Sequence, residues 1–437
     1  MSHNLEPSAE EWSTWVSQVL EFVNSKNMPT NSVRHSISEE PLLGGMPKIL
    51  GLLGHGIREA IPTHSAGFMA YVPGGGIPSA ALANFLGNIT NRFTGIEDQA
   101  PVLVAFEKQV INWFCQEFAL PATAFGILTS GGSSANLTAI ICARVQALGD
   151  TGDFSKARLY VSDQVHHSVQ KAAFLAGIPR DNCVRIESDS QFCLSVEHLK
   201  QQIELDHKAG LRPFLVVGSA GTTSTGSIDP LEELAALCKQ KGLWFHVDGA
   251  YGGAFVLCDS GKTRLRGIEL ADSITFDPHK GLFLPYGTGC LLVKDRSSLL
   301  KVHRYEADYL HPSECDSPAS LGPELSREYR GIRLWLPLML HGAGAFRREL
   351  AEKLELTDWL YQELSKLSVE ILLKPALSVL VFRPDVVERV NSYGRVYLSS
   401  THLRGVMSTR VCILSFRTHQ AQVQACLEDI QKALYES

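Results

Sequence analysis

The sequence predicts an α/β fold with a mostly parallel central sheet, an N-terminal helical segment and a small C-terminal α+β domain. Between about residues 100 and 300, short apolar runs alternate with helical stretches, which is typical of a parallel sheet covered by helices. Beyond residue 340, strand-like runs precede a final helix. The length of 437 residues agrees with several domains, because single cores rarely grow beyond about 250–300 residues.

The composition is that of an ordinary globular protein, with 45% hydrophobic and 20% charged residues. The net charge of −6 and the absence of a basic run disfavour nucleic acid as a partner and favour a small molecule. The acidic N-terminus does not resemble a secretory signal, and no apolar run reaches the roughly 18 residues that span a membrane. The ten cysteines are scattered without zinc-site spacing, so we expect reduced thiols in a cytoplasmic protein and no metal site.

The first expected element is an amphipathic helix over residues 9–27. Its apolar face requires a covering surface and comprises Trp12, Trp15, Val16, Val19, Leu20 and Val23. Residues 41–80 are rich in Gly and Pro and indicate ordered loop with short helix. We expect domain boundaries that give an N-terminal segment over 1–60, a large domain over 61–340 and a small domain over 341–437.

In the large domain we expect strand-like runs that are separated by helical stretches. The strand-like runs are FGILTS, RLYVSD, FLVVGSA, LWFHVD, SITFDP and GCLLVK, and the helical stretches are 134–147, 165–176, 194–209 and 230–241. In the small domain a long helix, FRRELAEKLELTDWLYQELSKL, precedes the strand-like runs SVLVFRP, RVYLSST and RVCILSF and the final helix QAQVQACLEDIQKAL. Ligands of open α/β sheets bind beyond the carboxyl ends of the strands, so the polar residues there are the candidate site.

Two of these strand ends could bind a ligand through phosphate and ring contacts. The first strand leads into Gly131, Gly132, Ser133 and Ser134 at the start of a helix, a combination that can cradle a phosphate but is also found in an ordinary capped turn. The second leads into His166, followed by His167, and an imidazole there could stack on a ligand ring or simply cap the helix.

Three further strand ends add hydroxyl, acidic and amine groups. A Thr/Ser loop contains Thr222, Thr223 and Ser224, which could bind a ligand oxygen or form only a loop. Asp248 ends an apolar strand and needs a cationic partner, which could be a protonated ring nitrogen, an Arg or a metal. Lys280 follows another strand beside His279, where an apolar setting favours a reactive amine.

The order of these groups is more specific than any one of them. A phosphate cradle, a ring-stacking His, a strand-end Asp and a strand-end His-Lys pair are the parts that pyridoxal 5'-phosphate (PLP) needs. The phosphate is anchored, the ring is stacked, the ring nitrogen is kept protonated and the aldehyde is bound by the lysine.

On the motifs HVDGAYGG, FDPHKG, TSGGSSANL, SDQVHHSV and AGTTSTGSIDP, the chain resembles the group II PLP-dependent amino-acid decarboxylases, from about residue 40 to 340. The resemblance implies the aminotransferase-like fold of PLP fold type I. It also implies an internal aldimine on Lys280, with Asp248 beside the ring nitrogen. His166 would stack on the ring, and Thr223 would lie near the ring hydroxyl. Phosphate ligands would be Ser133, Ser134 and His279.

The resemblance further implies a homodimer with the active site at the subunit interface. The N-terminal helix would clasp the partner, Tyr71 and Pro73 would line the substrate pocket, and Phe93, in FTGIED, would reach into the partner's site. We therefore expect a cytoplasmic carboxy-lyase that acts on an L-amino acid, with an aromatic substrate favoured.

The identity of the product stays open at this point. Relatives protonate the substrate carbon with a tyrosine on a loop after the Lys-bearing strand, but residues 304–335 have no tyrosine in their middle, although Tyr305, Tyr309 and Tyr329 flank it. In this family, loss of that tyrosine accompanies oxidative deamination to an aldehyde. His167 is another possible acid, and another PLP lyase or C–C bond-forming reaction is a further alternative.

Overall fold

The computed structural model describes residues 8–24, 41–150, 152–304 and 317–436. The chain forms two compact units, Met1–Thr63 and His64–Ser437. Tyr305 and Tyr309 lie outside the described residues. The domain boundaries expected at residues 60 and 340 remain predictions.

The first unit contains a pair of helices, α1 (Ala9–Asn24) and α2 (Gly45–Glu59), which contact each other. The helix expected over 9–27 is therefore present, and its last three positions lie outside the described residues. No residue of α1 is buried, and Trp15, Val19, Leu20 and Val23 of its apolar face are exposed.

The second unit is built on a seven-stranded sheet in the order β1-β7-β6-β5-β4-β2-β3. Its strands are β1 (Phe125–Thr129), β2 (Ala157–Ser162), β3 (Cys183–Ile186), β4 (Arg212–Ser219), β5 (Trp244–Asp248), β6 (Ser273–Phe276) and β7 (Gly289–Val293). The mostly parallel sheet confirms the predicted fold class, and all six expected strands are present. The additional strand β3 lies at the sheet edge, where a short and half-polar run such as CVRI leaves little apolar signal.

Strand direction determines which strand ends meet. β7 pairs antiparallel with both β1 and β6, whereas β2, β4, β5 and β6 pair parallel with one another. The carboxyl ends of β1, β2, β4, β5 and β6 therefore lie at one edge of the sheet, as the candidate site requires.

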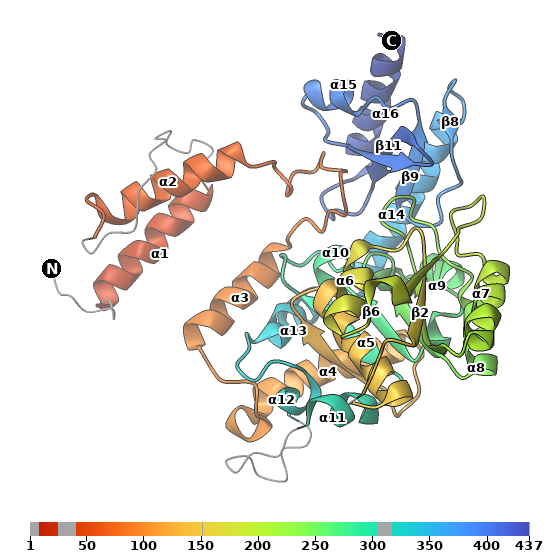
Figure 1. Ribbon diagram of the computed structural model, residues 1–437. Coiled ribbons are helices and arrows are strands. Elements are labelled where there is room, and N and C mark those ends of the chain that lie inside the picture. Colours follow the sequence, from red (N-terminus) through yellow and green to blue (C-terminus); the bar gives the residue numbers. More distant parts are fainter. Residues whose placement is uncertain (1–7, 25–40, 151, 305–316, 437) are drawn as a thin grey trace. The chain divides into compact units, whose positions relative to one another are not determined.

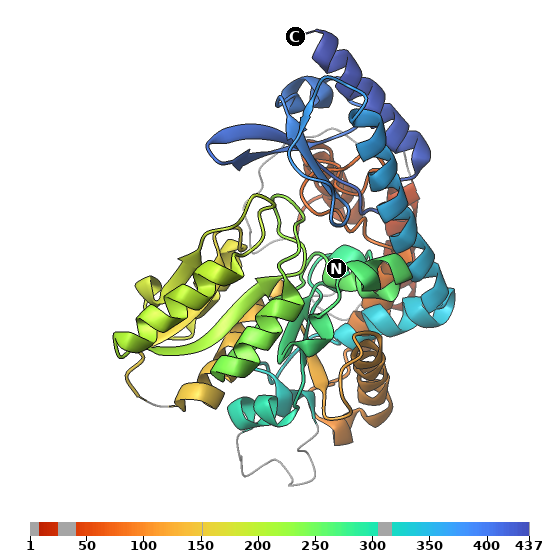
Figure 2. The same ribbon diagram turned by 90° about the vertical axis from the view of Figure 1, so that its right-hand side faces the viewer.

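Helices cover both faces of the sheet (Figures 1 and 2). In β4, Leu215 and Val217 pack in the core that contains Ile140 of α5, whereas Val216 packs with Leu234 of α8. The helices of this part of the chain are α3 (Pro78–Thr90), α4 (Pro101–Glu117), α5 (Gly132–Leu148), α6 (His167–Leu175), α7 (Val196–Lys208), α8 (Leu231–Lys241), α9 (Asp259–Arg264), α10 (Pro278–Gly281), α11 (Ser297–His303), α12 (Pro318–Leu321) and α13 (Arg330–His341).

The C-terminal part forms a second, four-stranded sheet in the order β10-β11-β9-β8, with a core of its own. Figure 2 shows the long helix α14 running from the large sheet to this smaller one. The elements are α14 (Ala343–Leu364), β8 (Glu370–Ile371), β9 (Val379–Arg383), α15 (Val387–Ser392), β10 (Ser399–Leu403), β11 (Val406–Cys412) and α16 (Gln420–Tyr435).

Two strands of this sheet are displaced from their expected positions. The runs RVYLSST and RVCILSF were expected as strands, but β10 begins four residues later than the first run and β11 begins four residues before the second. The first run is apolar because Val396 and Leu398 are buried in the small core, and Tyr397 bridges to Phe68 instead of pairing within the sheet.

Within the described residues, no helix has both the length and the apolar character needed to cross a membrane.

Candidate active site

The five parallel strand ends enclose a cavity of about 280 Å³. It gathers seven of the predicted site residues, which come from segments up to 147 residues apart in the chain. These residues are Ser133, Ser134, His166, Thr223, Asp248, His279 and Lys280. The sheet topology therefore brings the predicted cradle, ring contact, acid and amine to one place.

The cradle lies where β1 passes into α5. Gly132, Ser133 and Ser134 form the first turn of α5. The Ser134 N–H donates to the Gly131 carbonyl at 3.0 Å, whereas the N–H groups of Gly132 and Ser133 have no backbone acceptor among the described residues. A side chain at position 132 would place its Cβ 3.0 Å from Asp277 Oδ2 and 3.1 Å from Ala250 Cβ, so glycine allows the close approach of these segments. The Ser130 and Ser134 hydroxyls lie 2.9 Å apart. This turn can bind a phosphate group.

His279 supports the same end of the cavity. Its Nδ1 donates to the Thr288 carbonyl at 2.7 Å, which fixes the orientation of the ring. Nε2 lies 3.8 Å from Asp277 Oδ2.

Asp248 is held at the end of β5 by neutral donors. The backbone N–H of Ala250 donates to its Oδ1 at 3.1 Å, and Asn136 Nδ2 donates to its Oδ2 at 2.9 Å. Asp248 is 7% exposed, and among the described residues no Arg or Lys forms an ion pair with it. Its carboxylate can therefore accept a further hydrogen bond from a donor in the cavity.

Lys280 lies in the short helix α10, directly after β6. Its Nζ is 3.1 Å from Asp277 Oδ2, and its side chain is 25% exposed toward the cavity. Within the described residues, the other Asp277 oxygen, Oδ1, is buried without a hydrogen-bond partner. Asp277 was not singled out from the sequence, although its motif FDPHKG was.

His166 combines the two roles that the sequence left open. It is the N-cap of α6, and its Nδ1 accepts hydrogen bonds from the Ser168 backbone N–H at 3.3 Å and the Ser168 hydroxyl at 2.7 Å. It also lines the cavity. Burial, together with the nearby His167, lowers the pKa of His166, so the ring is neutral near pH 7. His167 is exposed and does not line the cavity, although its ring contacts that of His166.

Arg410 connects two of the predicted segments and was missed from the sequence. Its Nε donates to the Thr223 carbonyl at 2.8 Å, and its Nη1 donates to the Tyr71 carbonyl at 2.6 Å. Arg410 is 3% exposed, and its Nη2 has no partner among the described residues. The signal that could have found it is a charged residue within the apolar run TRVCIL.

The predicted substrate-pocket residues are not gathered as closely. Pro73 is buried and Tyr71 is 62% exposed, and a Cβ on the adjacent Gly74 would lie 2.1 Å from the His279 carbonyl oxygen. The segment that contains both residues therefore packs against the Lys280 turn. Phe93 does not line the cavity of its own chain, and its predicted role in the partner's site remains a prediction.

The loop tyrosine that is described does not serve the cavity. The Tyr329 hydroxyl donates to the Leu103 carbonyl at 2.8 Å, and the residue is 9% exposed. It is not among the cavity's lining residues.

A second cavity and a side-chain cluster lie elsewhere. The larger cavity, of about 660 Å³, lies between residues 227–233 and 373–376 and contains none of the predicted site residues.

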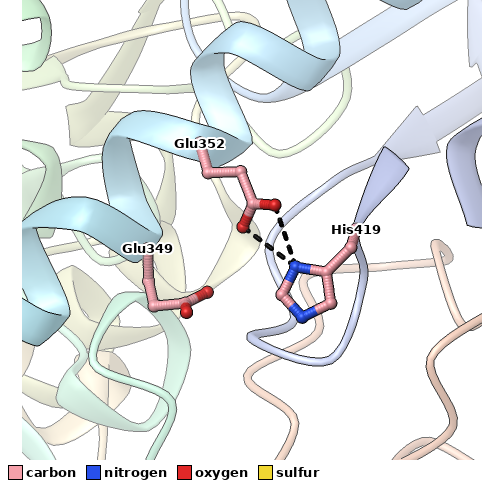
Figure 3. Close-up of side chains that lie close together, drawn as sticks. All are labelled: Glu349, Glu352 and His419. Atoms are coloured by element: carbon pink, nitrogen blue, oxygen red, sulfur yellow. Dashed lines mark hydrogen bonds and ion pairs between the residues drawn. The ribbon is translucent and has the colours of Figure 1, made fainter. Parts of the chain in front are cut away.

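Figure 3 shows a cluster of Glu349, Glu352 and His419. One carboxylate oxygen of each glutamate and one imidazole nitrogen of His419, the atoms that could bind a metal ion, lie within 4.8 Å of one another. The buried Lys353 Nζ lies 2.7 Å from Glu352 Oε2 and 3.1 Å from Glu349 Oε2, so an ammonium group already supplies positive charge to this cluster.

Comparison with known proteins gives consistent matches. The pyridoxal-dependent decarboxylase conserved domain matches residues 46–384. An aromatic-L-amino-acid decarboxylase of Bacillus atrophaeus is 33% identical over all of this chain and 98% of its own.

Solved structures agree with these matches. The tryptophan decarboxylase of Catharanthus roseus, in complex with L-tryptophan, has a TM-score of 0.87 and 26% identity, covering 99% of this chain and 100% of that one. The 4-hydroxyphenylacetaldehyde synthase of Rhodiola rosea has a TM-score of 0.87 and 25% identity, covering 98% and 99%.

Proposed function

Because the chain belongs to the pyridoxal-dependent decarboxylase family, and is thus a PLP-dependent carboxy-lyase, we propose that it decarboxylates an aromatic L-amino acid with Lys280 as the PLP-binding lysine. Lys280 and Asp248 line one cavity from the ends of neighbouring strands, and this observation carries the proposal. The aromatic substrate is supported by the relatives, which include the decarboxylases of Bacillus atrophaeus and Catharanthus roseus.

The residues of the cavity fit PLP. The first turn of α5 offers backbone N–H groups and serine hydroxyls to a phosphate, and Gly132 keeps this turn open. The Asp248 carboxylate is available to a protonated ring nitrogen because the described groups that donate to it, an amide and a backbone N–H, are neutral. Lys280 provides the amine that binds the aldehyde, and His166 is placed to contact the ring.

Bound PLP supplies an electron sink for the electrons that the departing carboxylate leaves behind. Asp248 would hold a proton on the ring nitrogen, which the electron sink requires. His166, neutral and fixed by Ser168, would orient the ring without adding charge. The surrounding apolar strands exclude water from the buried side of the site.

Oxidative deamination to an aldehyde is the second candidate. It is supported by the likeness to the Rhodiola rosea aldehyde synthase and by Tyr329, whose hydroxyl is bound to a backbone carbonyl instead of facing the cavity. Another PLP lyase or C–C bond-forming reaction is a more distant alternative.

A substrate screen tests the proposal. Aromatic, acidic and basic L-amino acids are each incubated with the purified protein, and carbon dioxide, amine, aldehyde, ammonia and peroxide are measured in parallel. We expect carbon dioxide and one aromatic amine. Aldehyde, ammonia and peroxide would establish the second candidate instead, and no turnover of aromatic substrates would reject the substrate class.

Two variants test the assigned residues. Wild-type protein should be yellow, and Lys280→Ala should lose the visible band because it lacks the amine that binds the aldehyde. Asp248→Asn should still bind PLP but lose at least about 100-fold in turnover, the size typical of losing a positioned proton-holding group. A wild-type protein that stays colourless with added PLP would reject the cofactor assignment.

We further propose that the enzyme is a cytoplasmic homodimer. On α3, Leu82, Phe85, Leu86 and Ile89 form an exposed apolar stripe at helical spacing, which a partner subunit could cover. The cysteines of the described segments are free thiols, which agrees with a reducing compartment.

A further inference from the structure

A buried chain of hydrogen bonds runs behind Asp248, on the side away from the cavity. Trp244 Nε1 lies 2.8 Å from Ser273 Oγ, which lies 2.8 Å from His246 Nδ1. His246 Nε2 lies 3.0 Å from Asn136 Oδ1, and Asn136 Nδ2 lies 2.9 Å from Asp248 Oδ2. Ser273, His246 and Asn136 are at most 1% exposed, and the cavity's lining residues include none of these intermediates.

Trp244 and Asp248, at the two ends of this hydrogen-bond chain, determine the direction of every hydrogen bond between them. The Trp244 indole can only donate, so the Ser273 hydroxyl accepts from it and directs its own proton to His246 Nδ1. An ionised Asp248 can only accept, so Asn136 turns its amide nitrogen to Asp248 and its oxygen to His246. His246 must therefore carry its proton on Nε2, and every donor points toward the carboxylate.

Asn136 also connects Asp248 to the ring-contact residue. Its Nδ2 lies 3.4 Å from Ser168 Oγ, and the Ser168 hydroxyl lies 2.7 Å from His166 Nδ1. One amide group in the second turn of α5 thus contacts Asp248 directly and also contacts Ser168, which supports His166. The same helix begins at the proposed phosphate cradle.

We infer that Asn136 and His246 are positioning residues for the cofactor, which keep Asp248 ionised and aimed at the ring nitrogen through a one-directional chain of hydrogen bonds from Trp244. This inference rests on the proposed function. Aligned donors polarise one another in a buried site, so each bond strengthens the next and favours the negative charge at its end. Burial lowers the pKa of His246 to about 4, which keeps its ring neutral and the direction of the chain unchanged near pH 7.

The test measures the ring nitrogen itself. Holoenzyme is prepared with PLP that carries ¹⁵N in its ring, and the ¹⁵N resonance reports whether this nitrogen is protonated. His246→Leu removes the donor to Asn136, and Asn136→Ala removes the donor to Asp248. We expect both variants to move the resonance toward unprotonated pyridine and to lower turnover roughly tenfold, the lower end of the effect of losing an outer-shell partner.

A conservative variant and a matched control separate this role from simple loosening of β5. His246→Gln retains an amide N–H that can donate to Asn136, so it should recover part of the wild-type resonance. Val247→Ala weakens packing at the neighbouring position, whose side chain points to the opposite face of the strand. This control should leave the resonance in place.

The inference is overturned if the resonance stays at the wild-type position in Asn136→Ala and His246→Leu, or if Val247→Ala moves it equally. The proposed function fails separately, if wild-type protein binds no PLP. Histidine ¹⁵N spectra of the full chain without cofactor distinguish the two failures. If these spectra show that His246 carries its proton on Nε2, the hydrogen-bond chain is supported even when the protein binds no PLP. A proton on Nδ1 would contradict the proposed chain.

Discussion

Two carboxylates, Asp248 and Asp277, line the same cavity, but their surroundings give them different partners. Asp248 accepts from a backbone N–H and an amide, whereas Oδ2 of Asp277 lies 3.1 Å from Lys280 Nζ. Asp248 has no cationic side chain as partner in the described part of the chain, so its carboxylate is the one available to a protonated ring nitrogen. Asp277 instead holds the amine near the cradle, where its second oxygen has no partner among the described residues.

Gly132 allows these groups to approach each other, and its replacement is the first prediction. In Gly132→Ala the new Cβ would meet Asp277 Oδ2 at 3.0 Å and Ala250 Cβ at 3.1 Å, so the cradle must shift. Overpacking of this kind costs roughly 1–3 kcal/mol, and we expect PLP affinity to fall about tenfold or more. Equilibrium titration of the visible band measures it. Gly56→Ala, where a Cβ meets no atom within 4 Å, should leave the affinity unchanged, and an equal loss there would contradict the explanation.

Two histidines, the buried His246 and the partly buried His303, predict how stability depends on pH. Burial lowers the pKa of both His246 and His303 from 6.5 to about 4. Between these pH values the unfolded chain binds protons that the folded chain does not, so stability falls as the pH falls. Each histidine corresponds to roughly 3 kcal/mol over this range.

Urea unfolding at pH 6.5 and at about pH 4 tests this prediction. His303→Asn should reduce the loss of stability on acidification and leave the cofactor signals intact, because His303 lies on α11, outside the cavity. His246→Gln should reduce the loss similarly but alter the ring-nitrogen signal. An unchanged acid dependence in both variants would show that other groups dominate.

The sequence could predict that Asp248, Lys280 and the Ser133/Ser134 turn lie together because each follows an apolar run, and the strand ends meet at one edge of the sheet. It could not identify Asn136 or Arg410 in the same way. Asn136 lies inside an apolar helix, and its contacts with Asp248 and His246 join residues more than 100 positions away. Arg410 lies within a strand of the other sheet, and only the tertiary fold brings it to Thr223 and Tyr71.

At the scale of elements, apolar runs located the buried strands of the large sheet well, whereas the parallel edge strand β3, which is mostly not buried, was not expected. The direction of each strand could not be predicted in this way, because the sequence of the antiparallel strand β7 is as apolar as those of its parallel neighbours. In the C-terminal sheet, burial of Val396 and Leu398 outside any strand displaced the expected boundary. Apolar character reports burial, and strand pairing has to be inferred from additional evidence.

The junction of α14 and α16 depends on one buried charge. Lys353 is fully buried in α14, where its Nζ donates to Glu352 Oε2 and to the Thr418 carbonyl, both at 2.7 Å. His419, which caps α16, lies 2.9 Å from Glu352 Oε1 (Figure 3). Burial raises the pKa of Glu352, but hydrogen bonds from Lys353 and His419 outweigh it and lower that pKa overall.

Lys353→Met is therefore expected to lower the free energy of unfolding by roughly 1–3 kcal/mol, because the Thr418 carbonyl and Glu352 lose a charged donor while the carboxylates left behind stay partly exposed. Chemical denaturation measures this loss. Lys366→Met removes an exposed pair with Glu363 just beyond the same helix and should cost at most about 1 kcal/mol. Equal losses in the two variants would mean that the buried cluster does not stabilise the junction.

At the scale of the whole molecule, apolar surface remains on several helices of the single chain. The α3 stripe of Leu82, Phe85, Leu86 and Ile89 lies on one helical face, and each member is at least 39% exposed. An exposed stripe of this kind is typical of a surface that a partner covers. If Phe93 reaches into the partner's site as predicted, each active site needs two subunits, and catalysis depends on this surface forming the dimer.

The double variant Leu82→Glu/Ile89→Glu places two charges in this stripe, and burying them without partners would cost more than the apolar contact contributes. We expect sedimentation to show a dimer for the wild type and a monomer for the variant, with loss of turnover. Leu205→Glu, at an exposed leucine of α7, should remain dimeric and active. A dimeric double variant would place the interface elsewhere.

Mixing inactive variants tests whether the sites are shared. Lys280→Ala lacks the amine, and Phe93→Ala lacks the residue predicted to reach into the partner's pocket. If Phe93 acts across the interface, subunits exchanged between the two variants form dimers in which one site has both its own Lys280 and the partner's intact Phe93. Turnover should then return in the mixture although each variant alone is impaired. If Phe93 serves its own chain, every site in the mixture keeps one of the two defects, and the mixture should show no more activity than the Phe93→Ala subunits supply.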